Sequence, residues 1–362
     1  MGAQPVRCRP DAALSHDRRV SRPSRPDRRC ARVCAVRAAV IGLGLIGGSL
    51  LRALAGAGHT VLGYDADPST RAMARTAAAK VRTGTRWRVT GSVPDAVEGA
   101  DLVALAVPLP AIPGVLDELA RTGHPGLVTD VTSVKVPVRA MVAERIGRLG
   151  LLAGYIGGHP MAGRETSGFD ASDPTLFQGC AWVLCLEPRT DMRDWLALAH
   201  LLTGLGARVV PATAEEHDRA VAAVSHVPHL VAAALVRLAA DDPLALTLAA
   251  GSFRDGTRVA ASQPGLTAAI CGGNAGTAGT ALDALLDSLG TARELLAEPD
   301  PIAALQAWLA PAARVRSAWP AAASEPVDLP PEPEVLLRLG RAGGWLVSVA
   351  PDLRSVSAAR PI

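Results

Sequence analysis

A glycine-rich turn near residue 42 constrains the fold of this chain more than any other feature. The segment VRAAVIGLGLIGGSLLRALAGAGHTVLGYD starts at Val36 and has the pattern of a strand, a glycine turn, a helix and a second strand. Gly42, Gly44 and Gly47 have the Gly-x-Gly-x-x-Gly spacing that permits a tight turn and close approach of a pyrophosphate to a helix N-terminus. This order predicts the first strand–helix–strand unit of a parallel, Rossmann-type sheet.

The residues expected to bind a dinucleotide lie at the ends of the predicted strands. Asp65 ends the second strand about 20 residues after the turn, where a carboxylate accepts a hydrogen bond from the ribose 2′-hydroxyl and repels a 2′-phosphate. The sequence therefore favours NAD over NADP, although Arg71 and Arg75 could soften that preference. A mononucleotide site and an inert glycine-rich turn are the alternatives. The predicted cofactor contacts are Gly42, Leu43, Gly44, Leu45, Ile46, Gly47, Asp65, Val107 and Pro108.

Periodicity and composition divide the chain into four parts. Residues 1–35 are arginine-rich and pattern-free, which indicates a disordered basic tail or a start codon assigned too early. Residues 36–213 contain further buried-strand patterns such as ADLVALAVP, and residues 214–310 have helical periodicity. We therefore predict an α/β Rossmann-type nucleotide-binding domain followed by an all-α domain. Residues 311–362 are expected to form a proline-rich linker and a short tail with at most one small hairpin.

Charge and cysteine content exclude several classes of protein. The net charge is +3, and much of the positive excess lies in the first 37 residues, so the rest of the chain lacks a nucleic-acid-binding footprint. The six cysteines form no C-x-x-C pair, which predicts a reducing compartment such as the cytoplasm. The apolar run HLVAAALVRLAADDPLALTLAAG contains Arg237, Asp241 and Asp242, which favours a buried helix pair over a membrane span.

One histidine lies in the segment GGHPMAG, Gly157 to Gly163. Proline restricts the residue before it and lacks an N–H, so we expect His159 on a tight loop rather than in a helix or a central strand. A structural histidine and a metal ligand are two interpretations of this residue. A general base beside a nicotinamide is the third, since imidazole accepts a hydroxyl proton near its pKa of about 6.5. The upstream dinucleotide pattern favours the third.

Two segments of the predicted helical domain are rich in polar residues. HDRAVAAVSHVPH contains His217, Asp218, His226 and His229, of which the last two are one helical turn apart. Their spacing resembles no common zinc site, so ligand contact or helix capping is the favoured interpretation and no metal is predicted. GSFRDGTRVAAS contains Arg258, which would be a natural anchor for a carboxylate if it faced a cofactor domain.

These motifs, in this order, resemble the prephenate/arogenate dehydrogenase family of tyrosine biosynthesis. The resemblance spans about residues 36–309 and rests on GLGLIGGS, DVTSVK, GGHPMAGRETSG, the HD and SHVPH segments, and FRDGTRVAASQP. It implies a nucleotide-binding domain and a helical domain that forms a homodimer. It also implies NAD-dependent oxidative decarboxylation of a small cyclohexadienol, either prephenate or arogenate, with prephenate dehydrogenase as the first choice.

The same resemblance implies roles for individual residues. His159 matches the histidine that contacts the 4-hydroxyl group of the substrate, and Ser133 matches the serine that shares this hydroxyl. Arg258 matches the arginine that binds a substrate carboxylate. His229 matches the helical wall of the substrate pocket, with His226 and Asp218 nearby.

One position departs from the family pattern. Many members have a tryptophan shortly after the arginine motif, where this chain has Thr267, so an analogue with nitrogen at C4 is a further candidate substrate. No ACT-type regulatory domain is recognisable. Other two-domain hydroxyacid dehydrogenases usually place a catalytic lysine on a later helix, and this chain has no lysine after Lys135. An inactive NAD-binding sensor is the alternative outside enzymes.

Overall fold

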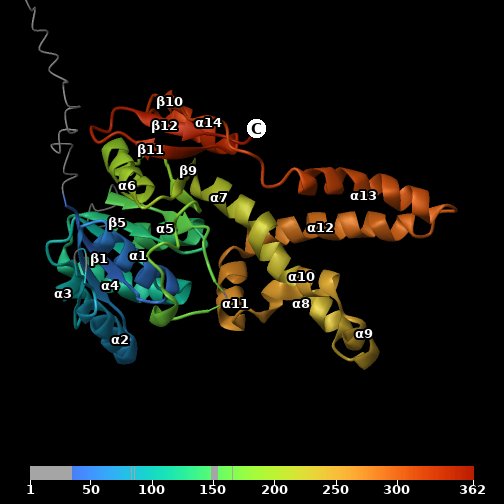
Figure 1. Cartoon of the computed structure of the whole chain (residues 1–362), viewed down its shortest axis with the longest axis horizontal. Helices are drawn as coiled ribbons and strands as arrows, with labels where there is room; N and C mark the ends of the chain where they lie inside the picture. Colours follow the sequence, from blue (N-terminus) through green and yellow to red (C-terminus); the bar gives the residue numbers. More distant parts are fainter. Residues whose placement is uncertain (1–34, 83, 85, 148–153, 165) are drawn as a thin grey trace, which may run out of the picture. The chain divides into compact units, whose positions relative to one another are not determined.

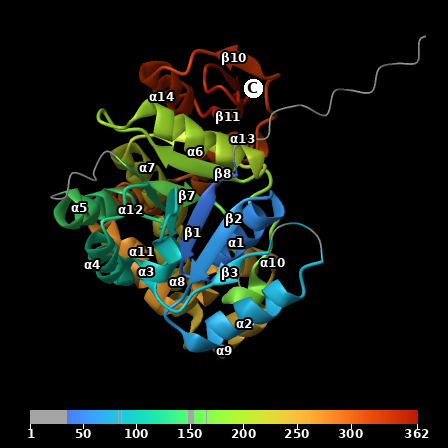
Figure 2. The same cartoon turned by 90° about the vertical axis from the view of Figure 1, so that its left-hand side faces the viewer.

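The computed structural model describes residues 35–362 except 83, 85, 148–153 and 165. Nearly all of the predicted basic tail lies outside the described residues. Two six-stranded sheets and a series of helices make up the described part (Figures 1 and 2).

The first sheet is the predicted parallel sheet, with strand order β3-β2-β1-β4-β5-β6. The strands β1, β4 and β5 contain the apolar runs seen in the sequence, as expected for strands that are covered on both faces. The central strands β1 and β4 are almost completely buried. The strands are β1 (Arg37–Ile41), β2 (Thr60–Tyr64), β3 (Arg88–Val89), β4 (Leu102–Leu105), β5 (Leu127–Asp130) and β6 (Tyr155–Ile156). The helices are α1 (Leu45–Gly56), α2 (Pro68–Ala79), α3 (Val93–Val97), α4 (Ile112–Thr122) and α5 (Val136–Arg145).

The second sheet combines segments that are far apart in the sequence, in the order β10-β12-β11-β9-β8-β7. Its first three strands along the chain are β7 (Gly158–Pro160), β8 (Ala181–Cys185) and β9 (Arg208–Ala212), with α6 (Met192–Gly204) between the last two. The C-terminal segment adds β10 (Val327–Leu329), α14 (Pro333–Arg341), β11 (Trp345–Val349) and β12 (Val356–Ala359). Strand β11 pairs antiparallel with β9 at Leu346 and Val209, which joins the C-terminal segment to the nucleotide-binding part.

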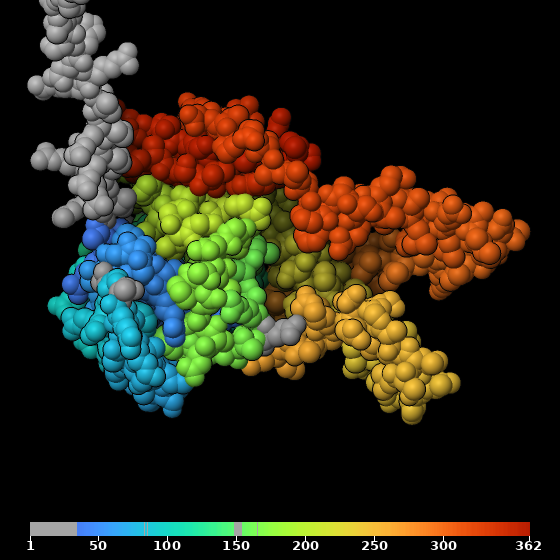
Figure 3. Space-filling view, viewed as in Figure 1, coloured from blue at the N-terminus to red at the C-terminus, as the bar shows by residue number. Residues whose placement is uncertain are grey.

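Two expectations were wrong here. His159 lies in a short strand, β7, and not in a loop, because β7 is at the edge of its sheet, where a proline is tolerated. The segment 311–362 is not a linker with a short tail. Helix α13 continues to Ser317, and Leu336, Leu346 and Val356 are buried in the same core cluster as Trp195 of α6. Figure 3 shows the C-terminal residues, in red, packed against the yellow-green surface that contains α6.

A capping box marks the start of the helical part. Thr213 and Glu216 form a capping box that starts α7 (Ala214–Val221), and a π-helix, η5 (Ala222–His226), joins α7 to α8 (Val227–Ala239). The remaining elements are α9 (Pro243–Leu248), α10 (Gly251–Thr257), η6 (Arg258–Ala261), α11 (Pro264–Gly273), α12 (Ala275–Leu295) and α13 (Pro301–Ser317). Helices α12 and α13 lie side by side (Figure 1).

The apolar run in this part forms the expected pair of helices, α8 and α9, but the pair is not buried. Leu238 is 84% exposed and Leu248 is 70% exposed within the single chain. The continuous helical stretch 214–239 is long and apolar enough to cross a membrane by length and composition alone. Its residues His217, Asp218 and His226 have side chains that are buried in contacts within the protein, so length and composition are weak evidence for a membrane span.

Candidate active site

The glycine turn after β1 has the backbone geometry that a bound pyrophosphate needs. Gly42 has φ +95° and donates its N–H to the Tyr64 carbonyl over 2.7 Å, which ties the turn to β2. A Cβ atom on Gly47 would lie 1.9 Å from the Gly42 oxygen, so the helix can start this close only with glycine. A Cβ atom on Gly44 would meet nothing within 4 Å, and no side chain caps the first turn of α1. The space beside Gly44 is thus open, and the first N–H groups of α1 have no side-chain partner, which suits an anion.

Asp65 lies beside this turn at the end of β2. Its Oδ2 accepts a hydrogen bond from the Leu43 N–H over 2.7 Å, and its Oδ1 accepts one from the Asp67 N–H over 2.8 Å. Each oxygen retains a lone pair for a ribose hydroxyl. The two nearby arginines donate to main-chain carbonyls, Arg71 to Asp65 and Ala66, and Arg75 to Val89 and Thr90. Val107 and Pro108 follow β4 at the same edge of the sheet. These residues therefore fit a dinucleotide without a 2′-phosphate.

His159 is part of a line of three hydrogen-bonded side chains. Its Nδ1 lies 2.8 Å from Nε2 of His217, and Nδ1 of His217 lies 2.7 Å from Oδ1 of Asp218. The Asp218 carboxylate also accepts the N–H groups of Lys135 and Val136 over 2.8 and 2.9 Å. All three side chains are buried, with His159 only 9% exposed. His217 of α7 thus reaches the strand that holds His159, and Asp218 of the same helix supports His217 from behind.

This line determines which nitrogen of each imidazole has the proton. The Asp218 carboxylate can only accept, so the proton of neutral His217 lies on Nδ1 and its Nε2 has the lone pair. Nδ1 of His159 must then donate to His217, which leaves a lone pair on Nε2 of His159. The line therefore prepares His159 to accept a proton.

Burial keeps these histidines neutral. The pKa of His159 lies well below its usual value because the ring is desolvated and lies close to His217, Lys135 and His226. Desolvation also lowers the pKa of His217 and of His226. Burial opposes ionisation of Asp218, but the hydrogen bonds from His217, Val136 and Lys135 hold its pKa below the usual value. Two neutral imidazoles thus lie in line with an ionised carboxylate.

A buried ion pair fixes the strand segment around His159. Lys135 Nζ contacts the Asp130 carboxylate and donates to the carbonyl of Gly158, and both charged side chains are almost completely buried. Asp130 also accepts hydrogen bonds from the Tyr155 hydroxyl over 2.8 Å and from the Gly158 N–H over 3.3 Å. Lys135 therefore holds both ends of the line from His159 to Asp218. Its side chain binds the carbonyl of Gly158, next to His159, and its main-chain N–H binds Asp218.

Sequence reasoning missed His217, Lys135 and Asp130 as members of this site. The DVTSVK segment is recognisable, but nothing local indicates that its lysine and the aspartate at its start contact residue 158. His217 belongs to its motif without a predicted role, because its contact with His159 joins positions 58 apart in the sequence. A contact across such an interval can be seen only in the folded chain.

The π-helix η5 explains how the polar segment of α7 and α8 converges. His217 and His226 are nine positions apart, and in a regular α-helix at ~100° per residue they would lie on opposite faces. A π turn accommodates an extra residue and rotates the helical turns after it. As a result, the side-chain amide of Asn274 reaches both segments. It contacts the main-chain carbonyl of Asp218 over 2.8 Å and Nδ1 of His226 over 3.2 Å.

The other predicted substrate residues lie on neighbouring elements. Ser133 is half-buried between β5 and α5, two positions from Lys135. His229 is half-buried in the first turn of α8, and its Nδ1 is buried without a hydrogen-bond partner among the described residues. Arg258 is exposed at the start of η6, which packs against α8. The line of hydrogen bonds thus brings His159 and Asp218 together, whereas these three residues are not members of it.

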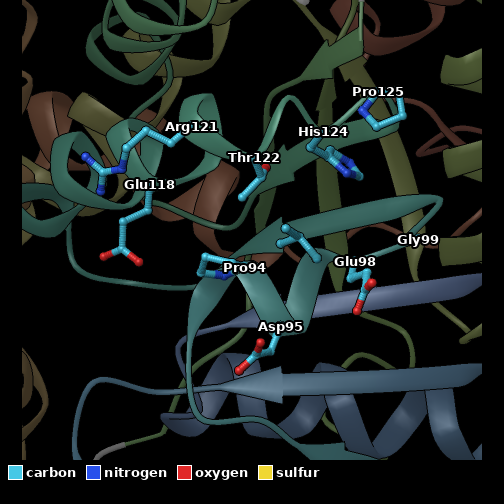
Figure 4. A pocket seen from close by; sticks show the side chains of 10 residues that line it. Pro94, Asp95, Glu98, Gly99, Glu118, Arg121, Thr122, His124 and Pro125 are labelled. Atoms are coloured by element: carbon cyan, nitrogen blue, oxygen red, sulfur yellow. The ribbon is translucent and has the colours of Figure 1, made fainter.

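A cavity of about 580 Å³ lies elsewhere on the nucleotide-binding part, between α3 and α4 (Figure 4). Its lining includes Glu118, Arg121 and His124 and none of the residues discussed above. His124 precedes β5, so the cavity lies at the amino ends of the strands, whereas ligands of such sheets bind at the carboxyl ends. Among the described residues, no three His, Cys, Asp or Glu side chains are arranged to hold a metal ion.

The buried histidines predict an acid-sensitive fold. Their pKa values are lowered in the folded chain, so below about pH 6.5 the unfolded chain binds more protons and the free energy of unfolding falls as the pH falls. Each histidine contributes a slope of up to about 1.4 kcal/mol per pH unit in this window. Urea unfolding midpoints at pH 7.5, 6.5 and 5.5 measure the slope. A midpoint that stays constant over this range would contradict the prediction.

Comparison with families of known proteins gives two matches that adjoin one another. The family model described as "Prephenate dehydrogenase, nucleotide-binding domain" matches residues 48–211. The model described as "Prephenate dehydrogenase, dimerization domain" matches residues 213–310. The boundary between them falls at the start of α7, and the C-terminal segment of the second sheet lies beyond both.

Individual relatives agree with this assignment. The chain is 36% identical to prephenate dehydrogenase of Bacillus subtilis over 233 residues. The aligned region covers 62% of this chain and 60% of that protein, so the match spans less than two thirds of that relative. It is 34% identical over 271 residues to cyclohexadienyl dehydrogenase of Zymomonas mobilis, which is 72% of this chain and 89% of that protein.

A solved structure shows the same architecture. It is prephenate dehydrogenase from A. aeolicus in complex with hydroxyphenyl propionate and NAD⁺. The TM-score is 0.70 at 25% identity, covering 79% of this chain and 99% of that one.

Proposed function

Since the chain belongs to the prephenate dehydrogenase family, we propose that it catalyses the NAD⁺-dependent oxidative decarboxylation of prephenate to 4-hydroxyphenylpyruvate. The observation that carries the proposal is the line from Asp218 through His217 to His159, since it gives a buried, neutral imidazole a free lone pair. The glycine turn and Asp65 lie at the carboxyl edge of the first sheet, where NAD⁺ would bind.

The reaction needs a hydride acceptor, a base and a means of orienting the ring. NAD⁺, when bound, accepts the hydride that leaves ring carbon C4. His159 Nε2 takes the proton of the 4-hydroxyl as that hydride leaves, and Ser133 shares the hydroxyl. Loss of the ring carboxylate as CO₂ returns an electron pair to the ring, which becomes aromatic, and the proton returns to the phenolate oxygen. Because aromatisation drives the reaction, the protein mainly orients the ring and holds one proton.

The direct test is NADH formation with prephenate, with arogenate and with neither. We expect NADH only with a cyclohexadienol, and a higher kcat/KM with prephenate than with arogenate. Arogenate dehydrogenase is the second candidate, since the two substrates differ only in a keto or amino side chain remote from C4. No NADH with either substrate, from protein that is folded, would refute the proposed function.

We also propose that the helical part forms a homodimer. Its surface exposes several large apolar side chains that a single chain leaves in contact with water, and a second copy of the chain would cover them. They include Leu238, Leu244, Leu248, Leu286, Leu289 and Leu309. Light scattering after gel filtration measures the mass, and a monomer at micromolar concentration would contradict the proposal.

Asp65→Ser is expected to narrow the preference for NAD⁺ over NADP⁺. The wild-type carboxylate repels a 2′-phosphate, and serine removes that repulsion while keeping a small polar group. Serine also loses the contact with the Leu43 N–H, so kcat/KM for NAD⁺ should fall at the same time. The ratio of kcat/KM for the two cofactors is the measurement. Equal use of both cofactors by the wild-type protein would overturn this account of Asp65.

Arg258→Ala is expected to raise KM for the cyclohexadienol by about one to two decades and to leave NAD⁺ binding unchanged. A charge-assisted contact between an arginine and a carboxylate contributes roughly 1.5–3 kcal/mol. Arg254→Ala, in the preceding turn, is the matched control. If KM for Arg258→Ala changes by less than about threefold, Arg258 does not bind the substrate carboxylate.

A further inference from the structure

Asn274 is the only asparagine in the chain, and its side chain is buried at the start of α12. Its amide nitrogen lies 2.8 Å from the Asp218 carbonyl oxygen and 3.2 Å from Nδ1 of His226. It therefore links α12 to α7 and to the π-helix at once. No motif assigned a role to this residue.

The two contacts of Asn274 determine the tautomer of His226. A carbonyl oxygen only accepts, so the amide nitrogen must be the atom that faces Asp218, and this settles the orientation of the side chain. The second hydrogen of the same nitrogen points to Nδ1 of His226, which must therefore have a lone pair. Neutral His226 then has its proton on Nε2. Desolvation lowers the pKa of His226, which agrees with a neutral ring.

The Nε2 atom of His226 is buried and has no hydrogen-bond partner among the described residues. The whole residue is 0% exposed. A buried donor without an acceptor is costly, and such groups in native proteins usually have a partner in a ligand or a bound water. Asn274 joins His226 to Asp218, whose carboxylate ends the line of hydrogen bonds from His159, so this donor belongs to the same site.

We propose that Asn274 is a positioning residue that holds His226 as the Nε2–H tautomer, so that His226 donates a hydrogen bond to an oxygen of the bound cyclohexadienol. The proposal deepens the proposed function and rests on it for the identity of the ligand. His159 and His226 then have opposite roles that their neighbours impose. His217 leaves His159 with a lone pair on Nε2, and Asn274 leaves His226 with a proton on Nε2. An ammonium group of a substrate could not take the place of this oxygen, because it has no lone pair to accept the hydrogen bond from His226.

The tautomer can be measured directly in the full-length protein. Long-range ¹H–¹⁵N spectra of histidine-labelled protein at pH 7.5, assigned with His226→Gln, should show His226 protonated on Nε2 alone. Selective ¹⁵N-asparagine labelling yields a single side-chain amide, whose two protons should exchange slowly with water. A proton on Nδ1 of His226, or a charged ring, would overturn the proposal without any assay of activity.

Variants test whether Asn274 is the cause. Asn274→Asp keeps the shape but replaces a donor by an acceptor, so the His226 proton should move to Nδ1, and Asn274→Ala should give a mixture of both tautomers. Thr280→Ala, on the exposed side of α12, is the control. Asn274→Asp should raise KM for the substrate about tenfold, the equivalent of one lost hydrogen bond, with NAD⁺ binding unchanged. An unchanged tautomer in both variants would refute the role of Asn274.

Ligand binding tests the second half of the proposal. Addition of hydroxyphenyl propionate with NAD⁺ should shift the Nε2–H proton of His226 downfield, because the donor gains an oxygen acceptor from the ligand. If that resonance does not move while the ligand is bound, the donor serves a buried water and the proposal is wrong. If the ligand binds and the resonance moves, yet no NADH forms with either substrate, the proposed function fails while the assignment of His226 stands.

Discussion

Replacement of His159 by asparagine is expected to lower kcat by roughly 10²–10⁴-fold while the protein folds normally and binds NAD⁺ and substrate. Asparagine has a similar volume and can still donate to His217, but it cannot take up a proton in this pH range. In the wild-type protein, kcat/KM should rise with pH through a group that titrates below about 6.5, because burial lowers the pKa of His159. That acidic limb should be flat in the variant.

The midpoint pH of this acidic limb also tests whether the folded environment of His159 lowers its pKa. The motif alone predicts a midpoint near the ordinary histidine pKa of about 6.5, whereas the neighbours of His159 move it to lower pH. His200→Asn is a control, since His200 lies on α6 and its Nδ1 contacts the Val349 carbonyl, away from the site. If His159→Asn keeps near-native turnover with the same acidic limb, His159 is not the base. If it loses stability while its folded fraction stays fully active, His159 is a structural residue.

Asp218→Asn is expected to lower kcat by a comparable factor, roughly 10²–10⁴-fold, although the Asp218 carboxylate contacts His217 and not His159. The amide group of asparagine can donate to Nδ1 of His217, and the proton of His217 then moves to Nε2. His159 would in turn present its lone pair to His217 and its proton to the substrate, so it would no longer be a base. KM for NAD⁺ should not change.

The same substitution should also lower the free energy of unfolding by about 1–3 kcal/mol, because the N–H groups of Lys135 and Val136 lose a carboxylate acceptor. Glu215→Gln, on the exposed side of α7, is the matched control and should affect kcat less than about threefold. Activity is compared at equal concentrations of folded protein, measured by near-ultraviolet circular dichroism. A variant that is destabilised but keeps near-native kcat would show that Asp218 only supports the fold.

The parts of the fold that the sequence predicts are those set by local patterns. The glycine turn and the apolar runs of β4 and β5 each depend on residues within a few positions of one another. The second sheet does not, because β9 pairs with β11 across more than a hundred residues. The strands from 327 to 359 are short, and the proline-rich segment before them resembles a linker when their distant partner is unknown.

The site obeys the same rule. His159, Asp218 and His226 could be named from motifs, since each lies in a short and specific pattern. Their roles could not, because a tautomer depends on the neighbours that the folded chain supplies. His217 and Asn274 are those neighbours, and each acts over at least 48 positions of sequence. The π-helix between His217 and His226 could not be predicted either, because the local periodicity predicts a continuous α-helix there.

The C-terminal segment has a consequence for how this chain is made. Synthesis proceeds from the N-terminus, so β9 and the inner face of α6 leave the ribosome well before β11 and β12, which cover them. The whole helical part, residues 214–317, is made in between and is therefore an insertion within one folding unit. Until the last forty residues are released, the nascent protein exposes a strand edge and the apolar side chains around Trp195. A ribosome stalled shortly before residue 345 should therefore hold a chain that recruits chaperones, whereas one stalled beyond residue 362 on a flexible linker should not.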